Sequence, residues 1–355
     1  MQDLSLAMMP TCGLTLGKFA PLHKGHQFLI ETALSEMDEV IVMVYDCPET
    51  TAVPLSIRAN WIRQRYPTVK VIEAWDGPTE VGHTPEIKQA HESYILEQLQ
   101  GLSVTHFYSR EFYGEHMSQA LGAVNRLVDW TSQSTWENRT AVPISATQVR
   151  TNPYQYRQFL DPLVYRDLIT HVVFLGAPST GKTTLAEALA RHYSTIWMPE
   201  YGRDYWETHQ VERRLSLEQL EDIATGHLER EDIQLTQANR YLFTDTNALT
   251  TYRFSHYYHG TATPHLAELA DRCASRYDLV FLCETDIPYD DTWDRSGKGN
   301  RAVFQKQIID DLVVRKIPFF RVRGDLQTRI GYVERILAQF EKYHNLLDHF
   351  QVAND

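Results

Sequence analysis

The segment HVVFLGAPSTGKTT, residues 171–184, decides the fold of the second half of the chain. Its apolar start, His171 to Leu175, is typical of a buried strand, and a helical pattern begins at Thr183. The loop between them matches G-x-x-x-x-G-K-[ST], a pattern whose backbone N–H groups surround phosphates. The segment therefore predicts an α/β sheet with a phosphate-binding loop. We expect phosphate contacts from Gly176, Ser179, Thr180, Gly181, Lys182, Thr183 and Thr184.

A second segment, GKFAPLHKGH at residues 17–26, has the same setting between a predicted strand and a predicted helix. His23 and His26 stand at the start of that helix, so both imidazoles can face one anion, while Gly25 lets the backbone approach it. Imidazole donors there can stabilise charge that develops on phosphorus during nucleotidyl transfer. A single histidine at a helix start is as readily a cap or a surface group, but the full string G-x-F-x-P-x-H-x-G-H disfavours that interpretation. We expect this loop to bind phosphate through Gly17, Lys18 and Phe19.

A third string, ISATQVR at residues 144–150, follows an apolar run. It resembles the I-S-x-T-x-x-R signature of nucleotidyltransferases, in which a helix N-terminus and an arginine hold the β- and γ-phosphates of ATP. Ser145 and Thr147 also have an ordinary interpretation as helix N-caps. Because the string ends the same predicted domain, we expect Ser145, Thr147 and Arg150 to bind the distal phosphates of ATP.

Length and composition restrict the remaining interpretations. A chain of 355 residues suits two domains of roughly 150 to 200 residues. Its 34 Lys and Arg against 46 Asp and Glu give a net charge of −12, which disfavours nucleic acid or an anionic membrane as the main partner. The cysteines are scattered without metal-ligand spacing, and no apolar run reaches the ~18 residues of a membrane span. We therefore expect a cytoplasmic protein with reduced thiols, no nucleic-acid partner and no membrane partner.

Alternating strand and helix patterns predict an α/β protein with two doubly wound parallel sheets. In the first half we expect strands at residues 14–19, 39–45, 69–74, 105–109 and 124–130, and helices at 23–37, 56–66, 85–99 and 116–121. In the second half we expect strands at 171–175, 194–198, 241–244, 279–283 and 317–322, and helices at 183–193, 216–239, 302–315 and 328–345. A helical stretch over 147–166 leads into the second half. The predicted domains are residues 1–168, a nucleotidyltransferase domain of Rossmann-like type, and 169–355, a P-loop kinase domain.

The segment PEYGRDYWE, residues 199–207, indicates where the P-loop half binds the molecule that accepts the phosphoryl group. It follows the second predicted strand of this half, where small-molecule P-loop kinases bind their acceptor. Its carboxylates can accept the proton of a sugar hydroxyl, and its rings can stack on a flat base. The plainer alternative is an amphipathic helix with aromatic core residues. We take Glu200, Tyr201 and Arg203 as acceptor-site candidates.

Two further features complete the predicted kinase site. Asp245 ends an apolar strand, the expected place of a carboxylate that organises a metal, and Thr183 is expected to coordinate Mg²⁺ while Lys182 reaches the phosphates. The segment 289–301 has the composition of a lid that closes over ATP, although it is also compatible with a solvated charged loop. Our lid candidates are Asp290, Asp291, Arg295 and Arg301.

Taken together, these motifs resemble the bifunctional NadR family over nearly the whole chain, from about Gly13 to Leu347. The resemblance implies that a kinase domain makes nicotinamide mononucleotide from nicotinamide riboside. The other domain then adenylylates the mononucleotide to NAD, with ATP as substrate and Mg²⁺ as cofactor. Some members also carry an N-terminal helix-turn-helix repressor domain. Since the first predicted strand already begins at Leu14, we expect the form without DNA binding.

The family resemblance implies catalytic roles residue by residue. The paired histidines of the family match His23 and His26, and its phosphate loop matches the segment that contains Lys182. Glu200 and Asp245 are our candidates for proton acceptor and metal organiser, and which carboxylate takes the proton stays open. The lid departs from the D-D-G-x-R form of the family, because residues 292–294 precede the arginine.

Two alternatives remain beside this interpretation. One is the coenzyme A pair, a phosphopantetheine adenylyltransferase fused to a dephospho-coenzyme A kinase, which also couples an H-x-G-H loop to a P-loop. The other is a nucleotide-sensing regulator without turnover, against which the intact His23, His26 and Lys182 argue. The sequence is compatible with a homo-oligomer.

Overall fold

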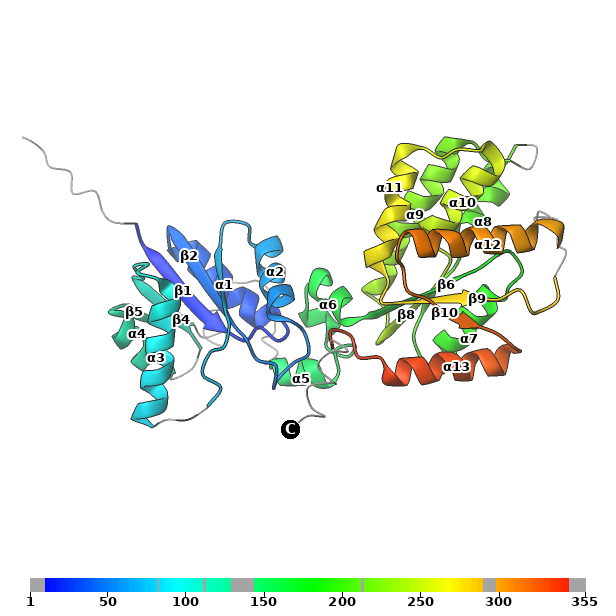
Figure 1. Ribbon diagram of the computed structural model, residues 1–355. Helices are drawn as coiled ribbons and strands as arrows, with labels where there is room; N and C mark the ends of the chain where they lie inside the picture. Colours follow the sequence, from blue (N-terminus) through cyan, green and yellow to red (C-terminus); the bar gives the residue numbers. More distant parts are fainter. Residues whose placement is uncertain are drawn as a thin grey trace, which may run out of the picture. The chain divides into compact units, whose positions relative to one another are not determined.

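The computed structural model describes residues 10–80, 82, 84–110, 113–128, 144–211, 214–289 and 298–344, without the side chains of 113 and 298–300. The chain divides into two compact units, of which one is Tyr165–Lys342 and the other is Met1–Val164 together with Tyr343–Asp355. Each unit has its own α/β fold and is described by itself (Figure 1).

The first unit is built on a five-stranded parallel sheet in the order β3-β2-β1-β4-β5. The chain runs outward from β1 to β3 and then returns to the other side of β1, where β4 pairs with it through Gly13–His106 and Leu14–Phe107. Such a switch point opens a crevice at the carboxyl ends of the two central strands. The strands are β1 (Cys12–Gly17), β2 (Glu39–Tyr45), β3 (Lys70–Ala74), β4 (His106–Ser109) and β5 (Val124–Leu127).

Helices cover both faces of this sheet, which explains why the inner strand β2 is apolar along most of its length. In β2, EVIVMVY, every residue after Glu39 is buried. Ile41 and Met43 share a core cluster with Ile95 and Leu99 of α3, and the alternate residues of β2 face the opposite side. The main helices are α1 (Lys24–Glu36), α2 (Leu55–Arg65), α3 (Pro85–Leu99) and α4 (Tyr113–Leu121).

The helical stretch predicted over residues 147–166 is broken into separate pieces in the structure. Pro153 and Pro162 explain the breaks, because proline has no N–H to donate and disfavours helical backbone in the residue before it. Asn152 accordingly leaves the helical region with φ −147°. The chain forms three short pieces here, α5 (Ala146–Thr151), a 3-10 turn (Arg157–Phe159) and α6 (Pro162–Leu168).

The second unit has a five-stranded parallel sheet in the order β10-β9-β6-β8-β7. Its first strand, β6, lies at the centre between β8 and β9, so the loop after β6 emerges in the middle of the carboxyl edge. The two doubly wound parallel sheets predicted from the sequence are thereby confirmed. The strands are β6 (Thr170–Leu175), β7 (Trp197–Met198), β8 (Tyr241–Asp245), β9 (Leu279–Cys283) and β10 (Phe320–Val322).

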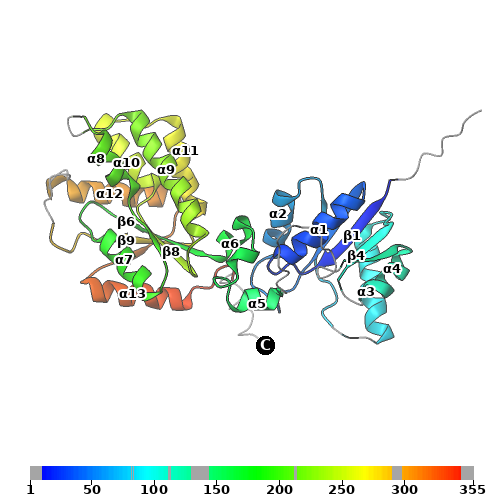
Figure 2. The same ribbon diagram turned by 180° about the vertical axis from the view of Figure 1, so that it is seen from behind.

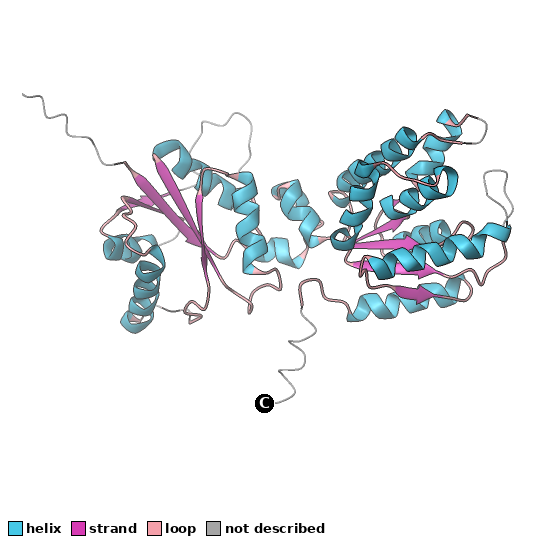
Figure 3. Cartoon of the chain, turned by 45° about the horizontal axis from the view of Figure 1, so that its top comes forward, coloured by secondary structure: helices cyan, strands magenta, loops and turns pink. Residues whose placement is uncertain are grey.

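Two core clusters lie on opposite faces of the second sheet. One joins Val173 and Leu175 of β6 to α9–α12, and the other joins Val172 and Phe174 to α7 and α13. Figures 1 and 2 show α7 and α13 on one face and α9–α12 on the other, and Figure 3 shows the same layers with helices in cyan and strands in magenta. The helices are α7 (Lys182–His192), α8 (Tyr201–His209), α9 (Leu217–Leu235), α10 (Ala248–His259), α11 (Pro264–Arg276), α12 (Lys298–Val314) and α13 (Leu326–Gln339).

Candidate functional sites

The two histidines of the first loop lie against each other at the start of α1. His23 is the N-cap, and its Nδ1 accepts a hydrogen bond from the Gly25 N–H at 3.1 Å. His26 Nδ1 accepts from the His23 N–H at 3.4 Å, and the two rings stack with their centroids 3.8 Å apart. Because Nδ1 accepts in both rings, the proton of each neutral imidazole is on Nε2. Each ring therefore carries one Nε2–H donor.

Burial and a neighbouring cation keep both imidazoles neutral. Burial first, and then the charge of Arg110, lower the pKa of His23 to about 4. Burial, His23 and Arg110 hold the pKa of His26 well below its ordinary value, while its contact with the Pro21 carbonyl acts in the opposite direction. Arg110 follows β4 directly, across the switch point from β1. Arg110 was not predicted as a site residue, although an arginine immediately after the predicted strand 105–109 is a signal present in the sequence.

The third sequence string lies beside the first loop. Arg150 donates through Nη1 to the carbonyl oxygen of Ala20 at 2.6 Å and through Nη2 to the hydroxyl of Thr147 at 3.1 Å. Ser145 caps α5 by accepting from the Gln148 N–H, and the side-chain oxygen of Gln148 accepts from the Ser145 N–H. The hydroxyl of Ser145 thus serves as the helix cap, while Arg150 joins the two strings that the sequence analysis singled out.

A cavity of about 770 Å³ brings most of these groups to one place in the first unit. Phe19 is not on its wall, because its ring is buried and makes an edge contact with His26 at 5.0 Å between centroids. Lys18 is half-exposed, and its Nζ lies 2.6 Å from Glu49 Oε1. A phosphate that reaches Lys18 must therefore compete with that carboxylate. The wall includes Gly17, Lys18, His23, His26, His91, Arg110, His116 and Ser145.

One buried arginine that the sequence did not indicate holds the first loop in place. Arg58 of α2 is 1% exposed and donates to the carbonyl oxygens of Lys18 at 2.5 Å and Tyr45 at 2.7 Å. Its Nε donates to the carbonyl oxygen of Val53 at 3.0 Å. The loop after β1 is therefore fixed to the end of β2 by a single guanidinium.

In the second unit, the loop after β6 requires glycine at two places. Gly176 has φ 143°, and a Cβ there would lie 2.6 Å from the carbonyl oxygen of Cys283. Gly181 has φ 79° and is the N-cap of α7. Ser179 also takes a left-handed conformation, with φ 65°. The loop consequently curls around the N-terminus of α7, where free N–H groups and the helix dipole favour a phosphate.

Three side chains from distant elements brace this loop from outside. Gln305 Oε1 accepts from the Ala177 N–H at 2.8 Å. Arg329 Nη1 donates to the carbonyl oxygen of Thr180 at 2.6 Å, and Arg301 Nη2 donates to that of Ser179 at 2.9 Å. Gln305 and Arg329 were not found from the sequence, because nothing in their local patterns points to a loop far away along the chain. Together the three side chains hold the loop preformed.

The predicted lid is only partly within the described residues. Asp290, Asp291 and Arg295 lie outside them. Arg301 belongs to α12, is buried, and also donates to the carbonyl oxygen of Ile287 at 3.0 Å. Its observed contacts are those of a residue that braces the phosphate loop.

The lysine and threonine of the loop meet the acid at the end of β8. Lys182 is buried and its Nζ donates to the carbonyl oxygen of Ala177 at 3.2 Å. The Thr183 hydroxyl donates to Asp245 Oδ2 at 2.5 Å, whereas Asp245 Oδ1 is buried without a hydrogen-bond partner among the described residues. Burial raises the pKa of Asp245 to about 6; the charge of Lys182 opposes this rise and that of Glu200 adds to it.

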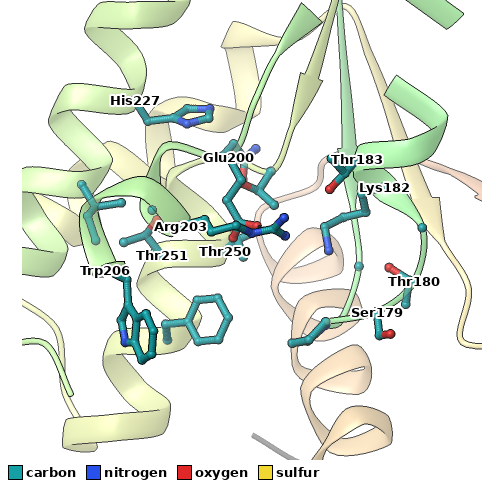
Figure 4. Close-up of a pocket in the computed structure, with 18 of the residues that line it drawn as sticks. Ser179, Thr180, Lys182, Thr183, Glu200, Arg203, Trp206, His227, Thr250 and Thr251 are labelled. Carbon is teal, nitrogen blue, oxygen red and sulfur yellow. The ribbon is translucent and has the colours of Figure 1, made fainter. Parts of the chain in front are cut away.

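A cavity of about 460 Å³ opens in front of the loop, between α8, α9 and α10. Figure 4 shows Glu200 and Arg203 between the phosphate loop and Trp206. Arg203 Nη2 lies 3.4 Å from Glu200 Oε2. Tyr201 is not among the lining residues, and its ring lies 3.6 Å from the guanidinium carbon of Arg230. All the phosphate contacts predicted for the loop after β6 line this cavity, namely Gly176, Ser179, Thr180, Gly181, Lys182, Thr183 and Thr184.

Apart from Trp206, which belongs to the predicted acceptor segment, the rest of this cavity was not predicted from the sequence. Its apolar walls have the chemistry to hold a flat ring, and a few polar side chains interrupt them. An acceptor with one flat and one hydroxylated part fits such a lining. The apolar members include Trp206, Leu215, Leu220, Ile223, Phe254 and Tyr258, and the polar ones include His227, Thr246, Asn247, Thr250 and Thr251.

The two units of the chain match two different families of known proteins. Residues 14–152 match the cytidylyltransferase-like family and residues 171–329 match the AAA domain family. The trifunctional NAD biosynthesis/regulator protein NadR of Salmonella typhimurium is 31% identical over 332 residues, which cover 88% of this chain and 78% of that protein. The protein of the same name from Escherichia coli is 30% identical over 336 residues, covering 89% and 79%. This chain belongs to the NadR family.

Solved NadR structures share the fold of the NadR-family chain described here. One, a crystal structure of NadR in complex with NAD and AMP-PNP, is 22% identical, covers 95% of this chain and 98% of its own, and superposes with a TM-score of 0.53. Another, in complex with NR, is 22% identical, covers 93% and 96%, and has a TM-score of 0.55. The chain thus combines a nucleotidyltransferase-like domain with a P-loop kinase-like domain, both homologous to NadR enzymes. Within the described residues, no helix has both the length and the apolar character to cross a membrane.

Proposed function

We propose that this protein makes NAD in two steps, by phosphorylating nicotinamide riboside and then adenylylating the nicotinamide mononucleotide that results. The observation that carries the proposal is that each unit has its own cavity lined by a phosphate-binding motif of a different kind. The paired imidazoles of the first unit suit nucleotidyl transfer, and the P-loop facing an acceptor cavity in the second unit suits phosphoryl transfer. The product of the second unit is then the substrate of the first.

In the kinase reaction, the 5′-hydroxyl of the riboside attacks the γ-phosphorus of ATP in line and ADP leaves. The N–H groups of the loop and Lys182 orient the phosphates and neutralise charge that spreads over their oxygens. Glu200 lines the same cavity and accepts the proton of the attacking hydroxyl. Trp206 and Phe254 provide apolar surface for the flat nicotinamide ring.

The donor set beside the P-loop fits a magnesium ion. Asp245 presents a buried oxygen without a hydrogen-bond partner among the described residues, next to the hydroxyl of Thr183. A carboxylate and a hydroxyl are the oxygen ligands that Mg²⁺ takes in P-loop enzymes. When bound, Mg²⁺ would neutralise the charge of the β- and γ-phosphates. Asp245 and Thr183 would hold it.

In the adenylyl transfer, the phosphate of the mononucleotide attacks the α-phosphorus of ATP and pyrophosphate leaves. His23 and His26 donate through Nε2–H to the oxygens on which charge develops, without a covalent intermediate. Arg110, beside the two rings, adds a positive charge at this end of the cavity. Both reactions rest mainly on orientation and charge neutralisation, for which preformed loops are well suited.

The test supplies the purified protein with ATP, Mg²⁺ and one acceptor at a time, with mass spectrometry as readout. Nicotinamide riboside should yield nicotinamide mononucleotide and then NAD. Phosphopantetheine and dephospho-coenzyme A should remain unchanged, which distinguishes this proposal from the coenzyme A pair. Binding of ATP without any product would instead support a nucleotide-sensing regulator.

A further inference from the structure

Helix α9 carries a buried face that begins at the kinase cavity and continues beneath it. Leu220 and Ile223 line the cavity, and His227 lines it one turn later. Figure 4 shows His227 at the edge of this pocket, away from the phosphate loop. One further turn along the same face lies Glu231, which is 0% exposed, and His227 is only 3% exposed. A polar pair therefore interrupts an otherwise apolar helix face.

Glu231 is an ionised carboxylate surrounded by donors. Arg276 Nε donates to its Oε2 at 2.7 Å, and the Tyr277 hydroxyl donates to its Oε1 at 3.0 Å. His171 Nε2 lies 3.4 Å from the same Oε1. Burial alone would raise the pKa of Glu231, but the neighbouring imidazoles of His171 and His227 hold it well below its ordinary value. In this state the carboxylate can only accept hydrogen bonds.

The position of Glu231 decides which nitrogen of His227 carries the proton. His227 Nε2 is buried and lies 3.5 Å from Glu231 Oε1, with no better-placed partner among the described residues. A carboxylate next to Nε2 favours the tautomer with the proton on Nε2, because two acceptors facing each other repel. Nδ1, for which the described part of the chain provides no hydrogen-bond partner, is then a free acceptor.

We propose that Glu231 is a positioning residue of the kinase: it fixes the tautomer of His227, so that His227 Nδ1 accepts a hydrogen bond from a hydroxyl or amide N–H of the acceptor. The proposal rests on the proposed kinase function of this cavity. It assigns the acceptor a donor group facing α9, opposite the phosphate loop. A ribose hydroxyl or a carboxamide has such a group, whereas a purely apolar ring does not.

The kinetic test compares the full chain with single variants, measuring KM for nicotinamide riboside, KM for ATP and kcat. Glu231→Gln supplies an amide that can donate to Nε2 and so reverses the tautomer. Losing one hydrogen bond to the acceptor should raise KM for the riboside about tenfold, with KM for ATP unchanged. The matched control is Asp232→Asn, the next residue of α9, which also binds Arg276 and is half-exposed. It should leave all three constants as in the wild type.

Two substitutions of His227 keep the proposal testable if Glu231→Gln does not fold. The amide of Asn can place an oxygen where Nδ1 lies, whereas the amide of Gln reaches the position of Nε2. His227→Gln should therefore raise KM for the riboside about tenfold and His227→Asn clearly less. Equal effects of both variants, or a fall in kcat with KM unchanged, would overturn the proposal.

A measurement without substrate separates this inference from the proposed function. Nitrogen-15 NMR of the histidine rings, with the signal of His227 assigned from its loss in His227→Gln, reports which nitrogen is protonated. We expect Nε2 to be protonated in the wild type and in Asp232→Asn, and Nδ1 in Glu231→Gln. A wild-type His227 protonated on Nδ1 refutes the inference even if the riboside is phosphorylated. Failure of the wild type to phosphorylate the riboside refutes the proposed function alone.

Discussion

Thr183, the last residue of the G-x-x-x-x-G-K-[ST] pattern, donates its hydroxyl hydrogen to Asp245 at the end of β8, with 2.5 Å between Thr183 Oγ1 and Asp245 Oδ2. The contact joins the loop after one central strand to the end of its neighbour. Asp245 Oδ1 has no hydrogen-bond partner among the described residues, so this oxygen and the hydroxyl oxygen of Thr183 are both available as metal ligands. The carboxyl edge of the sheet therefore presents a preformed oxygen donor set.

The pair predicts how Asp245→Asn should behave. The amide is a neutral and weaker ligand than the carboxylate, so the variant should need more Mg²⁺ to reach half of its maximal kinase rate. The measurement is the rate of nicotinamide mononucleotide formation against Mg²⁺ concentration. Asp222→Asn, which removes an exposed carboxylate on α9 that accepts from Tyr205, is the control and should leave the curve in place. An unchanged curve for Asp245→Asn would mean that another group organises the metal.

Lys182→Ala should stop formation of nicotinamide mononucleotide from the riboside while NAD formation from supplied mononucleotide continues. Lys182 is the buried cation of the P-loop, and its removal takes positive charge from the place where the γ-phosphate must be held. Both activities are measured on the same preparation, so the adenylyl transfer reports on folding of the chain. Riboside phosphorylation at the wild-type rate would contradict the kinase assignment.

His26→Ala is the complementary change. It removes one of the two stacked imidazole donors at the start of α1, and loss of one preorganised donor typically lowers a rate by ~10²–10³. NAD formation should therefore fall by that factor while riboside phosphorylation stays near normal. If both activities fell equally, the two units would not act independently.

Local patterns in the sequence were enough to predict the two sheets and the loops that follow β1 and β6. Strand runs such as 39–45 and 279–283 agree with β2 and β9 to the residue, because a buried parallel strand is apolar throughout. Helix α10 was missed, since its sequence ALTTYRFSHYYH is rich in β-branched and aromatic residues, which form helices weakly. The residues that indicate this helix lie at its ends, where Asn247 is the N-cap and Gly260 is the C-cap.

Side chains whose role comes from distant contacts could not be read from the sequence. Arg58, Gln305 and Arg329 act on loops that are far from them along the chain, and an isolated arginine or glutamine in a helix looks like any solvated residue. Tyr201 is an example of the opposite kind, because its local sequence pattern indicated a site residue and the structure places it outside the cavity. It stands inside the acceptor segment, but α8 turns it toward Arg230 instead of the cavity.

The neutral state of His23 can be tested by titration. With its pKa at about 4, the ring should stay uncharged at pH 5 to 6, where an ordinary histidine is protonated. Below about pH 6.5 the unfolded chain binds a proton at this residue that the folded chain does not, so the free energy of unfolding should decrease as the pH falls through this window. Proton NMR of the ring, assigned by its loss in His23→Gln, gives the pKa directly. A midpoint near 6.5 would show that burial and Arg110 do not act as inferred.

The role of Glu200 is the remaining question of chemistry in the kinase cavity. A riboside hydroxyl is far too weak an acid to lose its proton unaided at neutral pH, so a carboxylate that accepts the proton during transfer typically contributes ~10²–10⁴-fold. Of the two candidate carboxylates, Glu200 lines the cavity, whereas Asp245 is buried, is not among the lining residues and accepts from Thr183. Glu200→Gln should therefore lower kinase turnover by a factor in that range, with little change in ATP binding.

The decisive measurement is the kinase rate of Glu200→Gln across a range of Mg²⁺ concentrations, beside Asp245→Asn. A missing proton acceptor cannot be replaced by more metal, so the rate of Glu200→Gln should stay low at saturating Mg²⁺. Glu207→Gln, in the last turn of the same helix α8 and absent from the cavity wall, is the matched control and should keep the wild-type rate. Full recovery of Glu200→Gln with excess Mg²⁺ would exchange the two roles and make Asp245 the proton acceptor.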